Sequence, residues 1–143
     1  MKGKILILFL LISFLGLPAE EKMGARLTVQ TAGVRNSIGS INVAVYRSDS
    51  DFKKENFVYS GKIPASGNGI IQFHNLAPGR YAVAVFHDEN ENNKLDSNLL
   101  GIPKEGYGFS NHATGGITGP PKFSETGFSI SGEDIKIDIK LTY

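Results

Sequence analysis

Strict alternation of apolar and polar residues at the end of the chain is the feature that most constrains its fold. The odd positions from 135 to 143 hold isoleucine, leucine or tyrosine, and the even positions from 134 to 142 hold charged residues or threonine. Successive side chains of a β-strand point to opposite faces, so this pattern gives one apolar and one polar face. We therefore predict a half-buried strand here, and the fold must supply a sheet around it.

The same period of two recurs along the chain, with turn-forming residues between the repeats. Six or seven short strands predict an all-β, antiparallel β-sandwich with a transthyretin-like or immunoglobulin-like Greek-key topology. A small closed barrel is the alternative, because periodicity does not reveal whether the edges of the sheets meet. The other predicted strands lie at 27–33, 39–46, 57–63, 69–73, 79–87 and 123–130, with one helical turn around 50–56.

The N-terminal segment has the pattern of a secretory signal peptide. Lys2 and Lys4 precede an apolar run from Ile5 to Leu17, which is followed by Pro18-Ala19. This run is shorter than the stretch of about 20 apolar residues that a membrane-spanning helix needs. We expect a signal-peptide helix over residues 1–19, cleavage after Ala19, and one β-sandwich domain over residues 20–143 in a periplasmic or secreted protein with no membrane contact after cleavage.

Charge and cysteine content exclude several classes of function. The net charge is +1, without a basic excess or a run of like charges, which argues against a nucleic-acid partner. The chain contains no cysteine. A disulfide framework, thiol catalysis and a cysteine-ligated metal are therefore excluded, and the oligomeric state is left open.

Residues Phe73 to Tyr81 follow the pattern F-x-x-L-x-P-G-x-Y. Pro78-Gly79 favours a turn, and Phe73, Leu76 and Tyr81 are expected to pack together on its inner side. The pattern resembles the turn of transthyretin-like, collagen-binding B-type and carboxypeptidase regulatory domains. Its expected role is architectural.

The polar loop at residues 88–98 carries the clearest chemical signal. Carboxylate or amide oxygens recur at alternate positions, and Asn93 stands where a calcium loop usually has a left-handed glycine. Such oxygens converge on a hard cation, so Ca²⁺ is the candidate cofactor, bound weakly at about 10⁻⁴ to 10⁻³ M. The predicted ligands are the side chains of Asp88, Asn90, Asn92 and Asp96 and the backbone carbonyl of Lys94.

Two features of this loop leave its interpretation open. Leu99 occupies the position of the bidentate glutamate of an EF-hand, and the loop follows a strand, so an EF-hand is excluded. A closing carboxylate could come from Glu91 or from Glu105. The alternative is a solvated hairpin loop in which Asn and Asp cap their own backbone amides.

A long glycine-rich segment at residues 99–121 follows the polar loop. It lacks the spacing and the strand–loop–helix context of a phosphate-binding loop. Long structured loops often carry function, so this segment is the expected contact with an envelope protein or a glycan.

A long motif identifies a family. The pattern L-x-P-G-R-Y-A-V-A-V-F-H-D continues as D-E-N-x-N-x-K-L-D-x-N-x-L-G-I-P-K-E-G-Y-G-F-S-N from Asp88 to Asn111. This combination resembles the small exported bacterial proteins of domain of unknown function 2141, over about Leu27 to Tyr143. The resemblance implies an exported β-sandwich without an assigned activity. That family usually has glycine where Asn93 stands here.

These observations favour a non-catalytic envelope module, with calcium as its candidate stabiliser, that binds a protein or glycan through the long loop. One alternative is a hydrolase or metal-dependent enzyme that uses His87, Asp88, Glu105 and His112. It requires the rings of His87 and His112 to converge, and neither has a second histidine at i+2 or i+4. A purely structural accessory domain is the other alternative.

Overall fold

The computed structural model of the 143-residue chain describes residues 24–66, 69–115 and 119–143. The predicted signal peptide at residues 1–19 lies outside the described residues. Among the described residues, no helix has the length and apolar character needed to cross a membrane.

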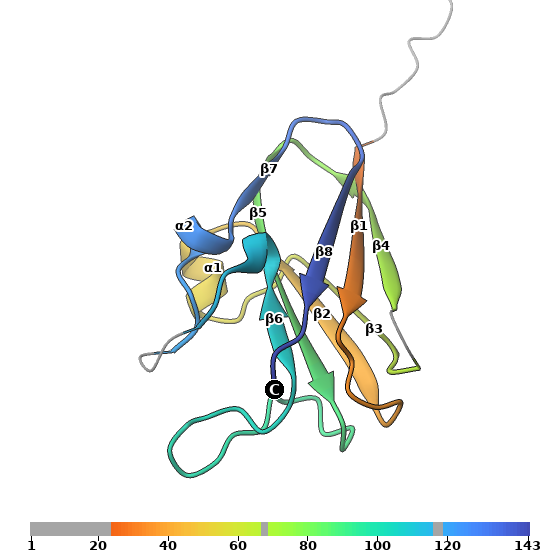
Figure 1. The fold of residues 1–143 in the computed structure, drawn as a ribbon. Helices are drawn as coiled ribbons and strands as arrows, with labels where there is room; N and C mark the ends of the chain where they lie inside the picture. Colours follow the sequence, from red (N-terminus) through yellow and green to blue (C-terminus); the bar gives the residue numbers. More distant parts are fainter. Residues whose placement is uncertain (1–23, 67–68, 116–118) are drawn as a thin grey trace, which may run out of the picture.

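Two sheets pack face to face, which confirms the predicted all-β sandwich (Figure 1). The first sheet has the order β4 (Ile70–Leu76), β1 (Ala25–Ala32) and β8 (Ile135–Lys140). In it β1 pairs in parallel with β8, and every other strand pair of the two sheets is antiparallel. The second has the order β3 (Tyr59–Pro64), β2 (Ser40–Tyr46), β5 (Gly79–Asp88) and β6 (Tyr107–Phe109), and β7 (Phe128–Ile130) pairs with the start of β5.

The core lies between the sheets and is built from the apolar positions of the alternating strands. Leu27 and Val29 of β1 are fully buried, as are Val83 and Ile139 from β5 and β8. Burial of such side chains contributes about 1.5–3 kcal/mol each. The buried core residues also include Ile41, Val43, Val45, Phe73, Leu76, Tyr81, Val85, Ile130 and Leu141.

The two sheets are joined along one side. Just after β8, Thr142 exchanges two backbone hydrogen bonds of 2.9 Å with Tyr107 of β6. On the other side, β3 and β4 form no strand pair in the described part of the chain. The fold is therefore a sandwich linked at one edge rather than the closed barrel considered as an alternative.

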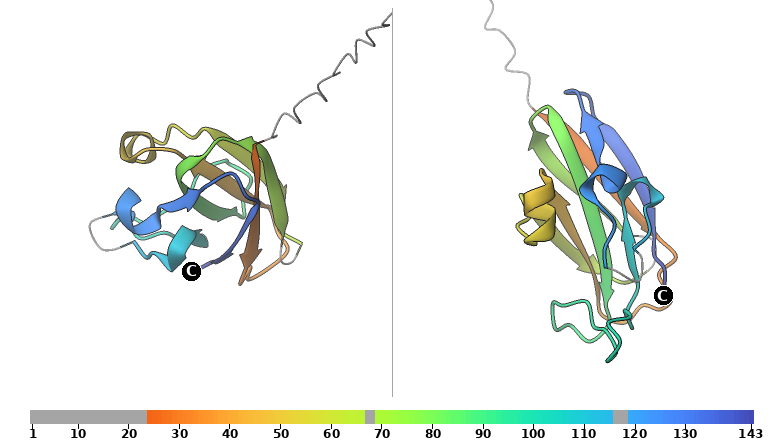
Figure 2. Two further views of the ribbon diagram at one scale, coloured as in Figure 1. Left: turned by 90° about the horizontal axis from the view of Figure 1, so that it is seen from above. Right: turned by 90° about the vertical axis from the view of Figure 1, so that its left-hand side faces the viewer.

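A second apolar cluster covers the outer face of the second sheet. Helix α1 (Asp49–Lys53) confirms the predicted helical turn, and the side chain of Ser48 caps it by accepting from the Asp51 amide at 3.0 Å. Phe52 of α1 packs against Tyr46, Ala82 and Phe123. Strand β5 is thus covered on both faces along part of its length, as its apolar sequence predicts (Figure 2).

The strand predicted at residues 123–130 is wrong over its first half. Residues Phe123–Thr126 form helix α2, and only β7 is a strand. The Glu125 side chain accepts from the backbone N–H of Lys122 at 2.8 Å, which stabilises a helical turn. Phe123 is buried in the outer apolar cluster rather than in a sheet.

The turn at Pro78-Gly79 joins β4 to β5, and Phe73, Leu76 and Tyr81 are buried beside it as expected. The hydroxyl of Tyr81 donates to the backbone carbonyl of Ala77 at 2.8 Å, which ties the strand to the turn.

Replacing Tyr81 by phenylalanine should lower the free energy of unfolding by about 1 kcal/mol, because this hydrogen bond is lost while the ring remains. Urea denaturation of both proteins measures the difference. Equal unfolding midpoints would show that the hydroxyl contributes nothing to the turn.

The glycine-rich segment 99–121 is not one loop in the structure. Its middle forms β6 and the 3₁₀ turn η1 (Ser110–His112), where the buried Ser110 hydroxyl accepts from Val83 N–H at 2.9 Å and donates to the Thr126 carbonyl at 2.7 Å. The segment between β5 and β6 projects beyond the strand ends, away from the start of β1 (Figures 1 and 2). Residues 97–103, bridged by Ser97 and Pro103, form its outermost turn (Figure 1).

Candidate functional site

Asp88 is the last residue of β5. It is the only acidic residue in the described chain with an exposed fraction of 0%. Its Oδ1 accepts from the backbone N–H of Asn92 at 3.0 Å, and its Oδ2 accepts from that of Asn93 at 2.8 Å. Asn93 has a φ of 61°, the left-handed conformation predicted for this position. The loop therefore curls around the Asp88 carboxylate.

The other side chains predicted as ligands gather on Asp96. The side-chain amide of Asn90 donates to Asp96 at 2.6 Å, and that of Asn92 donates to the same carboxylate at 3.1 Å. The backbone N–H of Lys94 donates to the Asn92 side-chain oxygen at 2.8 Å. The structure thus brings the side chains of Asn90, Asn92 and Asp96 together. They lie in the loop whose backbone N–H groups at 92 and 93 bond to Asp88.

Glu105 lies at the base of the loop, with 5% of the residue exposed. Its two oxygens accept from the backbone N–H groups of Glu89 and Asp96, both at 2.9 Å. Glu91, the other candidate for the closing carboxylate, points away and pairs with Lys62 at 2.6 Å. Of the two candidates, Glu105 is the one that contacts the polar loop's own backbone at both ends.

Backbone hydrogen bonds hold the carboxylates of this site, but no basic side chain that the structure describes neutralises their charge. Neither Asp88, Asp96 nor Glu105 forms an ion pair with a basic side chain among the described residues. Burying a carboxylate without a counter-charge is costly unless an ion or several hydrogen bonds replace the lost water. In the described chain no three His, Cys, Asp or Glu side chains are grouped so as to hold a metal alone. A cation here would also need the amide oxygens.

His87 is buried and both of its ring nitrogens are engaged. Nε2 lies 2.7 Å from the Ile38 carbonyl oxygen, and Nδ1 lies 2.8 Å from the Tyr143 hydroxyl. A carbonyl oxygen only accepts, so Nε2 carries the proton and, in the neutral ring, the hydroxyl donates to Nδ1. The same hydroxyl accepts from the backbone N–H of Arg35 at 3.0 Å.

His112 does not join the other residues of the enzyme alternative. Phe109 of β6 lies opposite Ala84, already three residues, or about 10 Å, along β5 from His87. His112 lies beyond Phe109 in the turn η1 and is exposed. The two histidines are therefore apart. The ring of His87 instead links Ile38 to Tyr143 by hydrogen bonds.

Sequence reasoning missed Tyr143 and Arg35 as partners at this end of the sandwich. Arg35 pairs with Glu89 at 2.5 Å, and its guanidinium lies over the Tyr143 ring at 4.6 Å from the centroid. In the sequence, Tyr143 is distinguished only as the last apolar residue of the alternating pattern at residues 134–143. No local signal connects residues separated by 54 or more positions.

Glu89 is held in its charged form. Burial raises its pKa, but hydrogen bonds from Asn36 and Arg35 and the charge of Arg35 outweigh burial, so the pKa of Glu89 lies below its ordinary value. A carboxylate with a lowered folded-state pKa stabilises the fold above the ordinary pKa, and this contribution is lost as the pH falls through the folded-state value.

Glu89→Gln is therefore expected to lower the free energy of unfolding near neutral pH, and the difference from the wild type should shrink at a pH below the ordinary glutamate value. Denaturant unfolding at several pH values measures this. A difference that stays constant with pH would exclude the Glu89 charge as its cause.

The outermost turn, residues 97–103, carries exposed aliphatic side chains. Leu99 and Leu100 have exposed fractions of 106% and 84%, the largest among the exposed large hydrophobic residues described. The Asn98 side-chain oxygen accepts from the backbone N–H groups of Leu100 and Ile102, at 2.9 and 3.0 Å. The turn is thus held by its own hydrogen bonds while its apolar side chains face solvent.

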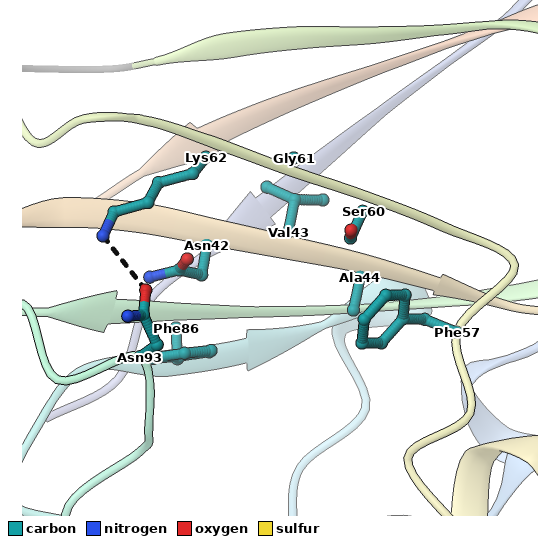
Figure 3. Close-up of a pocket in the computed structure, with 9 residues that line it drawn as sticks. All are labelled: Asn42, Val43, Ala44, Phe57, Ser60, Gly61, Lys62, Phe86 and Asn93. Carbon is teal, nitrogen blue, oxygen red and sulfur yellow. Dashed lines mark hydrogen bonds between the residues drawn. The ribbon is translucent and has the colours of Figure 1, made fainter.

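A shallow groove of about 350 Å³ lies on the outer face of the second sheet (Figure 3). Phe57 lies at one end, and Lys62 donates to the side-chain oxygen of Asn93 at 3.1 Å at the other. Asn93 belongs to both the groove and the polar loop. The groove brings together no set of acidic and basic side chains suited to acid–base catalysis.

The chain was compared with known proteins. No curated protein matches it. A crystal structure of a fimbrial assembly protein from Parabacteroides distasonis is similar at 10% sequence identity and a TM-score of 0.45, and the match covers 82% of this chain and 52% of that one. This chain thus spans about half the length of that protein. A family model described as "Uncharacterized protein conserved in bacteria (DUF2141)" matches residues 29–138. The chain therefore belongs to the bacterial family of domain of unknown function 2141.

Proposed function

We propose that the chain is an exported, non-catalytic envelope module whose polar loop binds one Ca²⁺. The ligands are the side-chain oxygens of Asp88, Asn90, Asn92 and Asp96 and the carbonyl of Lys94, with Glu105 as the closing carboxylate. The observation that carries this proposal is the burial of Asp88 and Glu105 without a basic partner in the described chain.

The donor set favours calcium over other metals. It consists of carboxylate, amide and carbonyl oxygens, which suit a hard cation. Ca²⁺ accepts about six to eight such ligands in flexible geometry, whereas Mg²⁺ demands a tight octahedron and gives up its water reluctantly. The side-chain amides of Asn90 and Asn92 donate to Asp96, and their oxygens accept from the backbone N–H groups of Asn92 and Lys94 at 3.2 and 2.8 Å. Binding of the ion would exchange these hydrogen bonds for oxygen–calcium contacts. Few charged ligands imply an affinity of about 10⁻⁴ to 10⁻³ M.

Calcium would act on the presentation of the projecting segment. The ion would link Asp88, at the end of β5, to Asp96, from which the outermost turn rises. Cross-linking these points would fix the turn relative to the sandwich. The exposed leucines would then be held ready for a contact in the envelope. Export itself is supported by the pattern of Lys2, Lys4 and the apolar run that follows.

Thermal unfolding with and without divalent ions tests the proposal. A ligand that binds only the folded state stabilises it by RT ln(1 + [L]/Kd). With a Kd of about 10⁻⁴ M, ~10 mM Ca²⁺ should add about 2.7 kcal/mol and raise the melting temperature by several degrees. The same concentration of Mg²⁺ should do much less. A melting temperature indifferent to Ca²⁺ would favour the solvated hairpin loop instead.

A further inference from the structure

The outermost turn carries apolar side chains that are not part of the hydrophobic core. Leu99 and Leu100 are almost completely exposed, and Ile102 is 57% exposed. They belong to the turn at residues 97–103 of the segment between β5 and β6, which projects beyond the strands (Figure 1). Clustered aliphatic side chains on such a projection mark a contact surface rather than part of the core.

The turn is preorganised for contact. Besides the two hydrogen bonds to the Asn98 side chain, Asn98 N–H donates to the Ile102 carbonyl at 2.8 Å, and Gly101 N–H donates to the Asn98 carbonyl at 2.9 Å. Ser97 and Pro103 bridge the two legs. The backbone of the turn therefore loses little conformational entropy when the leucines move from water into another medium.

The exposure and charge of the turn select the medium. Leu99, Leu100 and Ile102, the tip of the turn, lie within four consecutive residues and are exposed, and such clustered aliphatic side chains can enter the boundary between lipid headgroups and acyl chains. Lys94 and Lys104 lie on the two stretches of chain that lead into and out of the turn, which we call its neck. There Lys104 N–H donates to the Asp96 carbonyl at 2.8 Å. Both lysines are exposed, and neither has an acidic partner among the described residues. Their ammonium groups match the phosphates of an anionic membrane.

We propose that Leu99, Leu100 and Ile102 insert into the interface of an anionic lipid membrane while Lys94 and Lys104 contact its headgroups. The calcium part of this inference rests on the proposed function. Without the ion, the three carboxylates of Asp88, Asp96 and Glu105 outnumber the two lysines at the neck, which opposes anionic headgroups. With Ca²⁺ bound, the neck becomes positive and the membrane is attracted.

Vesicle co-sedimentation tests this inference. The probe is a set of vesicles of equal parts phosphatidylglycerol and phosphatidylcholine, and a second set of phosphatidylcholine alone. The exported protein is used after mass spectrometry confirms removal of the apolar N-terminal segment, which would itself bind lipid. Binding is expected to the anionic vesicles, to increase with Ca²⁺ and to weaken with added salt.

Two variants separate the apolar from the charged contribution. Leu99→Ser/Leu100→Ser should reduce partition into anionic vesicles tenfold or more, since two buried aliphatic side chains are lost. Lys94→Gln/Lys104→Gln should weaken binding to anionic vesicles and leave the weak binding to phosphatidylcholine unchanged. Val58→Ser is the matched control. It removes an exposed aliphatic side chain, 44% exposed, whose N–H bonds Val45 at the opposite end of β2 from Asp88.

The outcomes distinguish the two proposals. Calcium stabilisation without vesicle binding would overturn the membrane contact and leave the calcium module intact. Vesicle binding that the double leucine variant retains would also overturn it. Leucine-dependent vesicle binding in a protein that Ca²⁺ does not stabilise would support the membrane contact and contradict the calcium site. Specific retention of a soluble protein by the tip, with no lipid binding, would assign the surface to a protein partner.

Discussion

Replacing His87 by alanine is expected to lower the free energy of unfolding by about 3 kcal/mol or more. The substitution leaves a cavity at a fully buried position and removes the partners of the Ile38 carbonyl and the Tyr143 hydroxyl. Cavities and unsatisfied buried polar groups are among the few causes of losses this large. Urea denaturation followed by circular dichroism measures the change.

His74→Ala is the matched control, because His74 is exposed on β4 and its loss should change the free energy of unfolding by less than about 0.5 kcal/mol. If His87→Ala were as stable as His74→Ala, the imidazole would not be holding Ile38 and Tyr143 in place. A free, reactive imidazole would then return as an interpretation.

Much of the fold was predictable because β-periodicity is local. Leu27, Val29, Ile139 and Leu141 are buried as their alternation predicts. Strand β6 was not predictable, because its sequence Tyr107–Phe109 is short and glycine-containing. A Cβ at Gly108 would lie 2.8 Å from both the Ile139 side chain and the Lys140 carbonyl. Glycine is therefore needed where β6 packs closely against β8. The glycine that suggested a loop is required by the packing of a strand.

Pairing between distant segments could not be predicted either. Periodicity identifies strands but does not name their neighbours, so the parallel pair of β1 and β8 came only from the structure. In the candidate site, spacing alone predicted that Asn90, Asn92 and Asp96 would meet, because they lie within one short loop. Glu105 was left as one of two candidates because its position depends on how the chain returns from the outermost turn.

Replacing Asp88 by alanine is expected to abolish the stabilisation by calcium, a loss of about 2.7 kcal/mol at ~10 mM Ca²⁺. The substitution removes a proposed ligand and the acceptor for Asn92 and Asn93 N–H, around which the loop curls. Melting curves in Ca²⁺ and in chelator should therefore coincide for this variant, whatever its stability without the ion.

The matched control is Glu91→Gln, which removes one negative charge from the same loop without removing a proposed ligand. Its carboxylate pairs with Lys62 on the surface. Glu89 is unsuited to this purpose, since it is tied to Arg35 and Asn36. Glu91→Gln should keep the full calcium response. An equal loss in both variants would indicate diffuse charge screening rather than a bound ion.

Isothermal titration of Ca²⁺ into the chelator-treated protein tests the central claim most directly. The account predicts one saturable site with a Kd of about 10⁻⁴ to 10⁻³ M, no comparable heat from Mg²⁺, and no site in Asp88→Ala. Absence of saturable Ca²⁺ binding up to ~10 mM, or binding that Asp88→Ala retains, would contradict it.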